Sequence, residues 1–101
     1  MAAVRVVANF RVKPGRYADL FEGIKAVKKI AEGLGATGVV SRQTIGPETG
    51  NVFAVFVYKD HAAYAKVASD PAVTGLIDSM RNNPNPAWEG LTVSLNEEVA
   101  L

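Results

Sequence analysis

A segment of seven residues, 52–58, is apolar or aromatic at every position and has the sequence VFAVFVY. Successive side chains of a β-strand point to opposite faces of a sheet, so a strand of this composition has to be covered on both sides. The chain has 101 residues, which is enough for one core, and we expect residues 1–101 to form a single domain. Helices of that domain can cover one face of the strand, and the other face needs a different cover.

Hydrophobic periodicity predicts the other elements of this domain. Alternating apolar residues indicate strands, and apolar residues three and four positions apart indicate helices. The predicted strands cover 4–12, 37–45, 51–58 and 91–99, and the predicted first helix covers 17–34. Turn-forming residues at 46–50 join two of the strands into a hairpin. Gly23 lies inside the first helix at a cost of about 1 kcal/mol relative to Ala, which indicates a close packing contact.

A second helical region is predicted between the hairpin and the last strand. Asp60 is the expected N-cap, the first segment ends near Ser69, and Asp70-Pro71 restarts the helix with a cap residue followed by a proline at the first helical position. The order β-α-β-β-α-β predicts a ferredoxin-like α+β fold, in which four antiparallel strands carry both helical regions on one face.

The first predicted strand has two different faces. Its even positions are all apolar and its odd positions are mostly polar, with Val4, Val6, Ala8, Phe10 and Val12 on one side and Arg5, Val7, Asn9 and Arg11 on the other. In a chain this short, only a second subunit can cover the sheet face away from the helices, so we predict a homodimer through that face. If the apolar even positions form the dimer interface, Arg5, Asn9 and Arg11 point toward the helices and line a pocket there.

Composition excludes several functional classes. The chain has no cysteine, which rules out disulfides, CxxC redox pairs and thiolate metal sites. Eleven basic and ten acidic residues leave a net charge of +1, so we expect neither a nucleic-acid partner nor a membrane partner. The apolar N-terminus is interrupted by Arg5, Asn9 and Arg11, which predicts neither a signal peptide nor a membrane helix, and we expect a cytoplasmic protein.

Three stretches give the chain a resemblance to a known superfamily. Residues 12–17 (VKPGRY) join a strand to a helix, a glycine-bearing turn closes the hairpin, and residues 57–60 (VYKD) lead into an alanine-rich helix that ends at 69–71 (SDP). Over essentially its whole length the chain resembles the dimeric α/β-barrel superfamily, which contains antibiotic-biosynthesis-type monooxygenases, isomerases and small stress-responsive proteins. The resemblance implies two sheets that close into a shared barrel, and a pocket in each subunit between its helices and its sheet.

Haem-degrading members of this superfamily carry an Asn on the first strand, which Asn9 matches, together with a Trp and a His in the second helical region. Lys66 and Leu76 stand at those later positions here. Many monooxygenase-type members have a His in the helix after the third strand, where this chain has Val67, and His61 lies earlier. The resemblance therefore implies no haem, and we expect no cofactor and no metal.

The candidate catalytic residues are Asn9, His61 and Tyr64. A buried Asn polarises a carbonyl group or holds an enolate oxygen, and His61 is the one side chain whose ordinary pKa lies near neutral pH. Tyr64 follows His61 by three residues, so the two side chains can be neighbours on a helix. The alternatives are a solvated His61 in a first helical turn and a Tyr64 that fills the core.

The candidate substrate-binding residues are Arg11, Tyr17, Tyr58 and Trp88. An arginine can clamp a carboxylate with two hydrogen bonds, although Arg5 and Arg11 can also extend from the strand into solvent. Trp88 follows a Pro-Asn-Pro loop and either closes the pocket or anchors the last strand. Aromatic residues at such spacings also serve as ordinary core or interface packing.

These observations favour a protein that binds a small, largely apolar organic molecule, an aromatic or polyketide-like carbonyl compound. The expected chemistry is cofactor-independent, either proton transfer in an isomerase or cyclase or oxygenation of a substrate carbanion in a monooxygenase. The alternative is a non-catalytic ligand-binding or stress-associated dimer, which the single His and the absence of a paired acid and base favour. A further alternative is an assembly subunit that forms larger oligomers through its edge strands.

Overall fold

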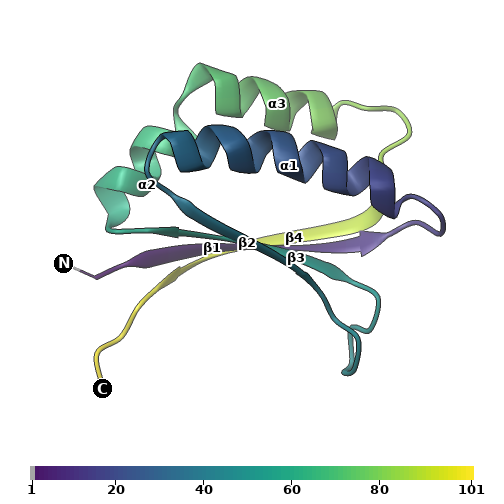
Figure 1. Ribbon diagram of the computed structural model, residues 1–101, viewed down its shortest axis with the longest axis horizontal. Helices are drawn as coiled ribbons and strands as arrows, with labels where there is room; N and C mark the ends of the chain where they lie inside the picture. Colours follow the sequence, from purple (N-terminus) through teal and green to yellow (C-terminus); the bar gives the residue numbers. More distant parts are fainter. Residues whose placement is uncertain (1) are drawn as a thin grey trace.

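The computed structural model describes residues 2–101, which form a four-stranded sheet with three helices on one face (Figure 1). The strands are β1 (Val4–Val12), β2 (Thr37–Arg42), β3 (Val52–Tyr58) and β4 (Trp88–Glu97), and the helices are α1 (Tyr17–Gly33), α2 (His61–Ala68) and α3 (Pro71–Arg81). The predicted ferredoxin-like α+β fold is confirmed. Its second helical region consists of two helices, α2 and α3.

The sheet has the strand order β2-β3-β1-β4, and every neighbouring pair is antiparallel. The two central strands are β1 and β3, and Val7 of β1 pairs with Val55 of β3. The segment that is apolar at every position therefore occupies the centre of the sheet, where both of its edges are hydrogen-bonded.

Both predicted helix caps are confirmed. The Asp60 carboxylate accepts a hydrogen bond from the Ala63 N–H at 2.8 Å, and the Asp70 carboxylate accepts one from the Ala72 N–H at 2.9 Å. Pro71 occupies the start of α3, where its missing N–H leaves no helical hydrogen bond unmade. The two caps fix the point at which the second helical region divides.

Two strands, β2 and β4, differ from their predicted ranges by more than one residue, because local pairing decides where they end. β2 stops at Arg42 rather than at residue 45, since its last pair with β3 is Arg42 with Val52 and the chain then enters the hairpin loop, where the Gln43 side chain accepts a hydrogen bond from the Glu48 N–H at 2.6 Å. β4 covers Trp88–Glu97 rather than 91–99, because its pairing with β1 continues to Val12 past an irregularity in the register.

The predicted orientation of β1 is wrong. Its even positions face the helices, where Val4 and Phe10 are buried in one core cluster with Leu20 and Ile24 of α1. The odd positions therefore lie on the opposite face of the sheet, and this places Asn9 away from the helices. Phe10 is too large to leave outside the main core, and α1 supplies the apolar surface that covers it.

The sheet face away from the helices carries an apolar stripe, which comprises Val7, Val39, Phe53, Val55 and Val57. Val39 is 58% exposed, and no helix of residues 2–101 covers this stripe. The β2–β3 hairpin and the C-terminal segment both curve away from the helices, which makes this face concave (Figure 1). The expectation that 52–58 needs a second cover agrees with this geometry.

Helices α1 and α3 approach each other closely at Gly23. A Cβ atom built on Gly23 would lie 3.0 Å from the Met80 methyl carbon and 3.4 Å from its sulfur. The predicted packing contact at Gly23 is therefore confirmed, and Met80 is the residue that occupies the space.

Candidate functional site

A pocket of about 370 Å³ lies between the three helices and the sheet. Its walls are mainly aliphatic and aromatic. The sheet contributes Val6, Ala8, Phe10, Ala54, Phe56, Leu91 and Val93. The helices contribute Ile24, Val27, Ala31, Val67, Val73, Ile77 and Met80. An apolar enclosure with a few polar groups is typical of a site for a small organic molecule. The pocket predicted between helices and sheet is therefore present in this chain.

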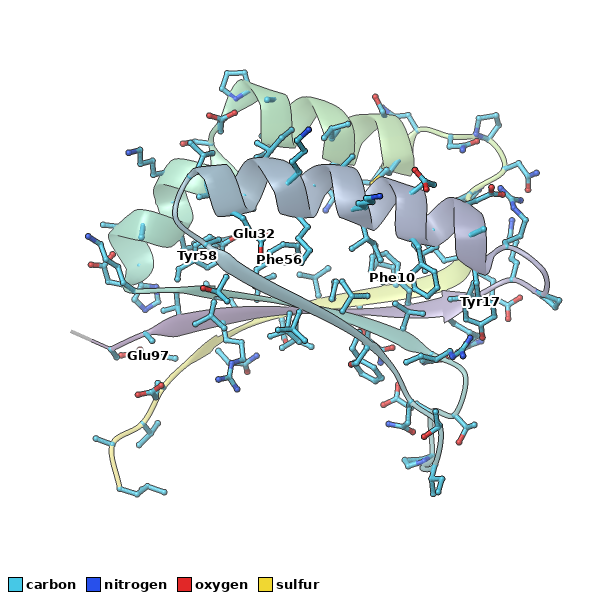
Figure 2. All side chains as sticks on the ribbon, in the orientation of Figure 1. Phe10, Tyr17, Glu32, Phe56, Tyr58 and Glu97 are labelled. Carbon is cyan, nitrogen blue, oxygen red and sulfur yellow. The ribbon has the colours of Figure 1, made fainter. Side chains whose placement is uncertain are left out.

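Tyr58 and Tyr64 form the polar end of this pocket. The two rings pack edge to face, with 5.5 Å between their centroids and 78° between their planes. Tyr58 is the last residue of β3 and Tyr64 lies in the middle of α2, so both contribute a phenol to the space under the helices. Figure 2 shows Tyr58 and Phe10 toward opposite ends of that space.

Burial raises the pKa of the Tyr58 phenol above its usual value, and the neighbouring Tyr64 raises it further. A buried phenolate would lack water to solvate its charge, so the neutral form is favoured. Tyr58 therefore remains a hydrogen-bond donor at neutral pH, which suits it to hold a carbonyl or enolate oxygen.

Trp88 lines the opposite end of the pocket. Its ring meets Phe10 edge to face at 5.4 Å between centroids, and it is the first residue of β4. The Lys13 N–H donates a hydrogen bond to the Ala87 carbonyl at 2.9 Å, which fixes the chain just before Trp88. Trp88 thus combines the two predicted alternatives, because it begins the last strand and also closes one end of the pocket.

Helix α3 contributes polar residues that the sequence analysis missed. Thr74, Asp78 and Arg81 all line the pocket, beside the apolar side chains of Val73 and Ile77. The spacing i, i+4, i+7 places the three polar residues on one side of the helix. In the sequence, this polar stripe beside the apolar face of the helix was the signal that could have identified the three residues.

Asn9 does not line the pocket in this structure. Its amide donates a hydrogen bond to the Glu48 carboxylate, and its Oδ1 accepts one from the Asn51 amide at 3.0 Å. The Asn51 amide also donates to Glu48 at 3.3 Å. Asn9 therefore connects β1 to the base of the β2–β3 hairpin, on the concave face of the sheet.

His61 lies outside the pocket at the start of α2. Its side chain is 60% exposed, and its Nε2 is 3.6 Å from a carboxylate oxygen of Glu97, which is equally exposed. His61 and Tyr64 are neighbours on the helix, but the pocket includes Tyr64 alone of the two. The structure thus agrees with the alternative of a solvated His61.

Tyr17 and Arg11 also lie outside the pocket lining. The Tyr17 hydroxyl donates a hydrogen bond to the Gly50 carbonyl at 2.7 Å, and the Arg42 guanidinium stacks on its ring at 5.2 Å from the centroid. Tyr17 thereby holds the hairpin against the start of α1. Arg11 is exposed on the concave side and lies beside Gly90 of β4.

Within residues 2–101, no group of three or more histidine, aspartate or glutamate side chains is arranged to hold a metal ion. None of the helices in that part of the chain combines the length and the apolar composition needed to cross a membrane.

Comparisons with known proteins identify the fold. No family model and no curated protein sequence matches the chain. Solved structures do match over nearly the whole of both chains. Rv0793 from Mycobacterium tuberculosis aligns with a TM-score of 0.75 and 12% identity, over 98% of this chain and 97% of its own. SnoaB from Streptomyces nogalater, a cofactor-independent oxygenase, aligns with a TM-score of 0.75 and 16% identity, over 98% and 95%.

A third structure, from Deinococcus radiodurans and provisionally described as an antibiotic biosynthesis monooxygenase, aligns with a TM-score of 0.75 and 15% identity, over 97% and 94%. The chain has the fold of the antibiotic biosynthesis monooxygenases. The resemblance indicated by the sequence is therefore confirmed for the fold. Fold alone does not carry function, which has to be argued from the pocket.

Proposed function

We propose that the pocket binds an aromatic or polyketide-like carbonyl compound and that the protein acts on it as a cofactor-independent enzyme. The observation that carries this proposal is the Tyr58–Tyr64 pair at one end of an otherwise apolar space of about 370 Å³. A ring system fits between the aliphatic walls, and its carbonyl oxygen accepts hydrogen bonds from the phenols. The similarity to the cofactor-independent oxygenase SnoaB supports the same class of chemistry.

The proposed reaction begins with loss of a proton from a ring carbon that is conjugated with the bound carbonyl group and lies across the ring from it, which leaves the negative charge on the carbonyl oxygen. Tyr58 stabilises the resulting enolate because its raised pKa keeps its proton on the phenol. Asp78 is the one carboxylate among the lining residues of the described chain, and we assign it as the proton acceptor. Tyr64 orients Tyr58 through the edge-to-face contact and is the second candidate donor.

The enolate can react in two ways in this site. Return of the proton to a different carbon completes an isomerisation or a cyclisation. Reaction with O₂ instead converts a CH₂ group into C=O, with one oxygen atom retained in the product and the other released as water together with the two hydrogens. We favour the oxygenation, because SnoaB, with the same fold, is an oxygenase.

We further propose that the protein is a homodimer through the concave sheet face. The apolar stripe there has no cover in residues 2–101, and burying apolar area contributes about 25 cal/mol per Å². The network of Asn9, Glu48 and Asn51 would lie at the rim of such an interface. Asn9 is thus proposed as an interface residue rather than a residue of the pocket.

A non-catalytic ligand-binding protein is the second candidate. The specific observation in its favour is that His61, the one histidine of the chain, is exposed and lies outside the pocket. A binding protein needs the apolar walls and the tyrosine donors but no proton acceptor.

Anthrone is a suitable test substrate, because its CH₂ group lies opposite a carbonyl group in a planar tricyclic ring. We expect the protein to consume one O₂ per anthrone and to release anthraquinone, and we expect Tyr58→Phe to lower the rate about 100-fold. Tyr17→Phe is the matched control, since it removes a phenol outside the pocket. Tight binding of anthrone without oxygen consumption would refute the oxygenation and favour the non-catalytic alternative, and no binding at all would refute the assignment of the pocket.

A further inference from the structure

We propose that Arg81 binds an anionic group on the ligand, so that the natural ligand is an elongated ring compound with a carbonyl oxygen at one end and a carboxylate at the other. This inference rests on the proposed function, because it assumes that the pocket is the ligand site. It adds a requirement for the ligand's charge, which the tyrosine pair by itself does not impose.

The first observation is the separation of the two polar ends. Tyr58 pairs with Val4 of β1, and Trp88 contacts Phe10, six residues further along the same strand. Six residues of a strand span about 20 Å. Arg81 is the last residue of α3, which ends on the same side as the start of β4 (Figure 1). Arg81 therefore lies toward the Trp88 end of the pocket, and Tyr58 lies at the other.

The second observation is the state of the Arg81 charge. The ion pairs formed within residues 2–101 involve Arg16, Lys28 and His61, and Arg81 belongs to none of them. An arginine stays charged at all physiological pH values and presents paired N–H donors that match a carboxylate. Arg81 is exposed at the rim of the pocket and forms no ion pair with a carboxylate of residues 2–101, so its guanidinium is a suitable partner for an anion on the ligand.

Asp78 lines the same pocket, three residues before Arg81, and would repel an anion next to it. Arg81 is the last residue of α3, so it lies three residues nearer to the end of the helix than Asp78 does. The assignment of Asp78 as proton acceptor requires a reacting carbon near it. The ligand's anionic group then lies past that carbon, toward Arg81.

The third observation is the apolar wall between the ends. Phe56, Ala54 and Ala8 of the sheet face Ile24 and Ile77 of the helices, and a charged group placed among them would lose its hydration without a partner. The anion therefore has to be terminal. Val93 and Leu95 of β4 are 56% and 44% exposed on this helix-facing side of the sheet, so the pocket has a wide margin along β4 for a ligand to enter.

Two probes of equal shape test the inference: anthraquinone-2-carboxylate and anthraquinone-2-carboxamide. We expect the unmodified protein to bind the carboxylate about tenfold more tightly by calorimetric titration, a preference that corresponds to about 1.4 kcal/mol. Arg81→Gln should abolish the preference, because it weakens binding of the carboxylate much more than binding of the carboxamide. Arg81→Lys should keep part of it, because the charge remains and the paired donors are lost. Arg5→Gln, which changes an exposed arginine outside this pocket, should retain the full preference.

Any other outcome of these titrations contradicts a specific part of the inference. Equal affinities in the unmodified protein, or a preference that survives in Arg81→Gln, would overturn the role of Arg81 while carboxamide binding upholds the pocket. Tighter binding of the carboxamide would also overturn it and would indicate that Asp78 dominates the charge. Failure to bind either probe would overturn this inference and the proposed function together. A thermal melt of Arg81→Gln verifies its folding, and Arg81→Lys supplies the test if that variant does not fold.

Discussion

The ring of Tyr58 meets the ring of Tyr64 edge to face at 5.5 Å, and this contact joins the end of the central strand β3 to the middle of α2. Edge-to-face pairs stabilise a structure by about 0.5–1.5 kcal/mol beyond the area they bury. The contact also sets the direction of the Tyr58 phenol in the pocket, so that stability and the proposed chemistry depend on the same pair of side chains.

The raised pKa of Tyr58 predicts how stability depends on alkaline pH. Its pKa is higher in the folded protein than in the unfolded chain, where it is near 10. The stabilisation is therefore fully present below pH 10 and is lost as the pH rises through the folded pKa. We expect the free energy of unfolding to fall above pH 10, and to fall less in Tyr58→Phe.

Absorbance at 295 nm follows the ionisation of the three tyrosines directly. Tyr58 should ionise in a late phase of this titration, and Tyr58→Phe should remove that phase. A late phase that persists in Tyr58→Phe and disappears in Tyr17→Phe would contradict the assignment.

Glu32 joins the end of α1 to β2. Its carboxylate accepts hydrogen bonds from the Lys28 ammonium at 3.0 Å and from the Gly38 N–H at 3.3 Å, and both lower its pKa below the ordinary value, the lysine more strongly. A lowered pKa stabilises the fold above the unfolded value of 4.5, and this stabilisation is lost as the pH falls through the folded pKa.

The variant Glu32→Gln should therefore melt at a lower temperature than the unmodified protein at pH 7, and the difference should shrink as the pH falls below 4.5. Glu22→Gln, on an exposed position of the same helix, is the control and should leave the melting temperature nearly unchanged. A difference for Glu32→Gln that is constant with pH would show that the charge is not the cause.

The N-cap of α2 is buried, which makes it sensitive to substitution. Asp60 is 8% exposed and accepts the Ala63 N–H at 2.8 Å. Replacing Asp60 by Ala should lower the free energy of unfolding by about 0.5–2 kcal/mol, measured by urea titration. Asp60→Asn keeps an oxygen acceptor and should cost less. Equal losses in the two variants would mean that the cap hydrogen bond contributes little.

The proposed dimer depends on the concave sheet face, and Val39 tests it. Val39 lies on the edge strand β2 and is 58% exposed, so a lysine there fits the folded subunit but places a charge within the apolar stripe. We expect the unmodified protein to be a dimer by light scattering and Val39→Lys to be a folded monomer. Lys25→Ala, on the outer surface of α1, is the control and should remain a dimer. A monomeric unmodified protein would disprove the proposed interface.

The fold could be predicted because the hydrophobic pattern of each segment and the turn or cap residues next to it indicate the same element. The apolar segment 52–58 indicated a central strand, and Asp60 and Asp70 marked both helix starts, since caps and prolines act within one turn of chain. The orientation of β1 could not be predicted by the same reasoning. The alternation of side chains along the strand shows that Val4 and Asn9 lie on opposite faces of the sheet. Which of these faces the helices cover depends on contacts between residues that are distant in sequence.

That single reversal accounts for the main error at the candidate site. Asn9 and Arg11 of β1 were expected to contribute to the polar lining beside the tyrosines, whereas they lie on the other face of the sheet and the remaining polar residues come from the stripe on α3. The even positions of β1 form the larger continuous set of apolar side chains, which includes Phe10. These side chains pack against the helices because the helices present the larger apolar surface. Tyr58, Tyr64 and Trp88 line the pocket, and their positions on β3, α2 and β4 do not depend on which face of β1 meets the helices.

The contact between Gly23 and Met80 has a consequence for substrate range. Met80 lines the pocket, and its methyl group rests where a larger residue at 23 would project a side chain. A thioether side chain has three rotatable bonds, so it can change rotamer to accommodate a methyl or hydroxyl substituent on a ligand while the helix backbones stay in place. This part of the wall is therefore adaptable, and we expect the protein to accept a series of related ring compounds rather than a single one.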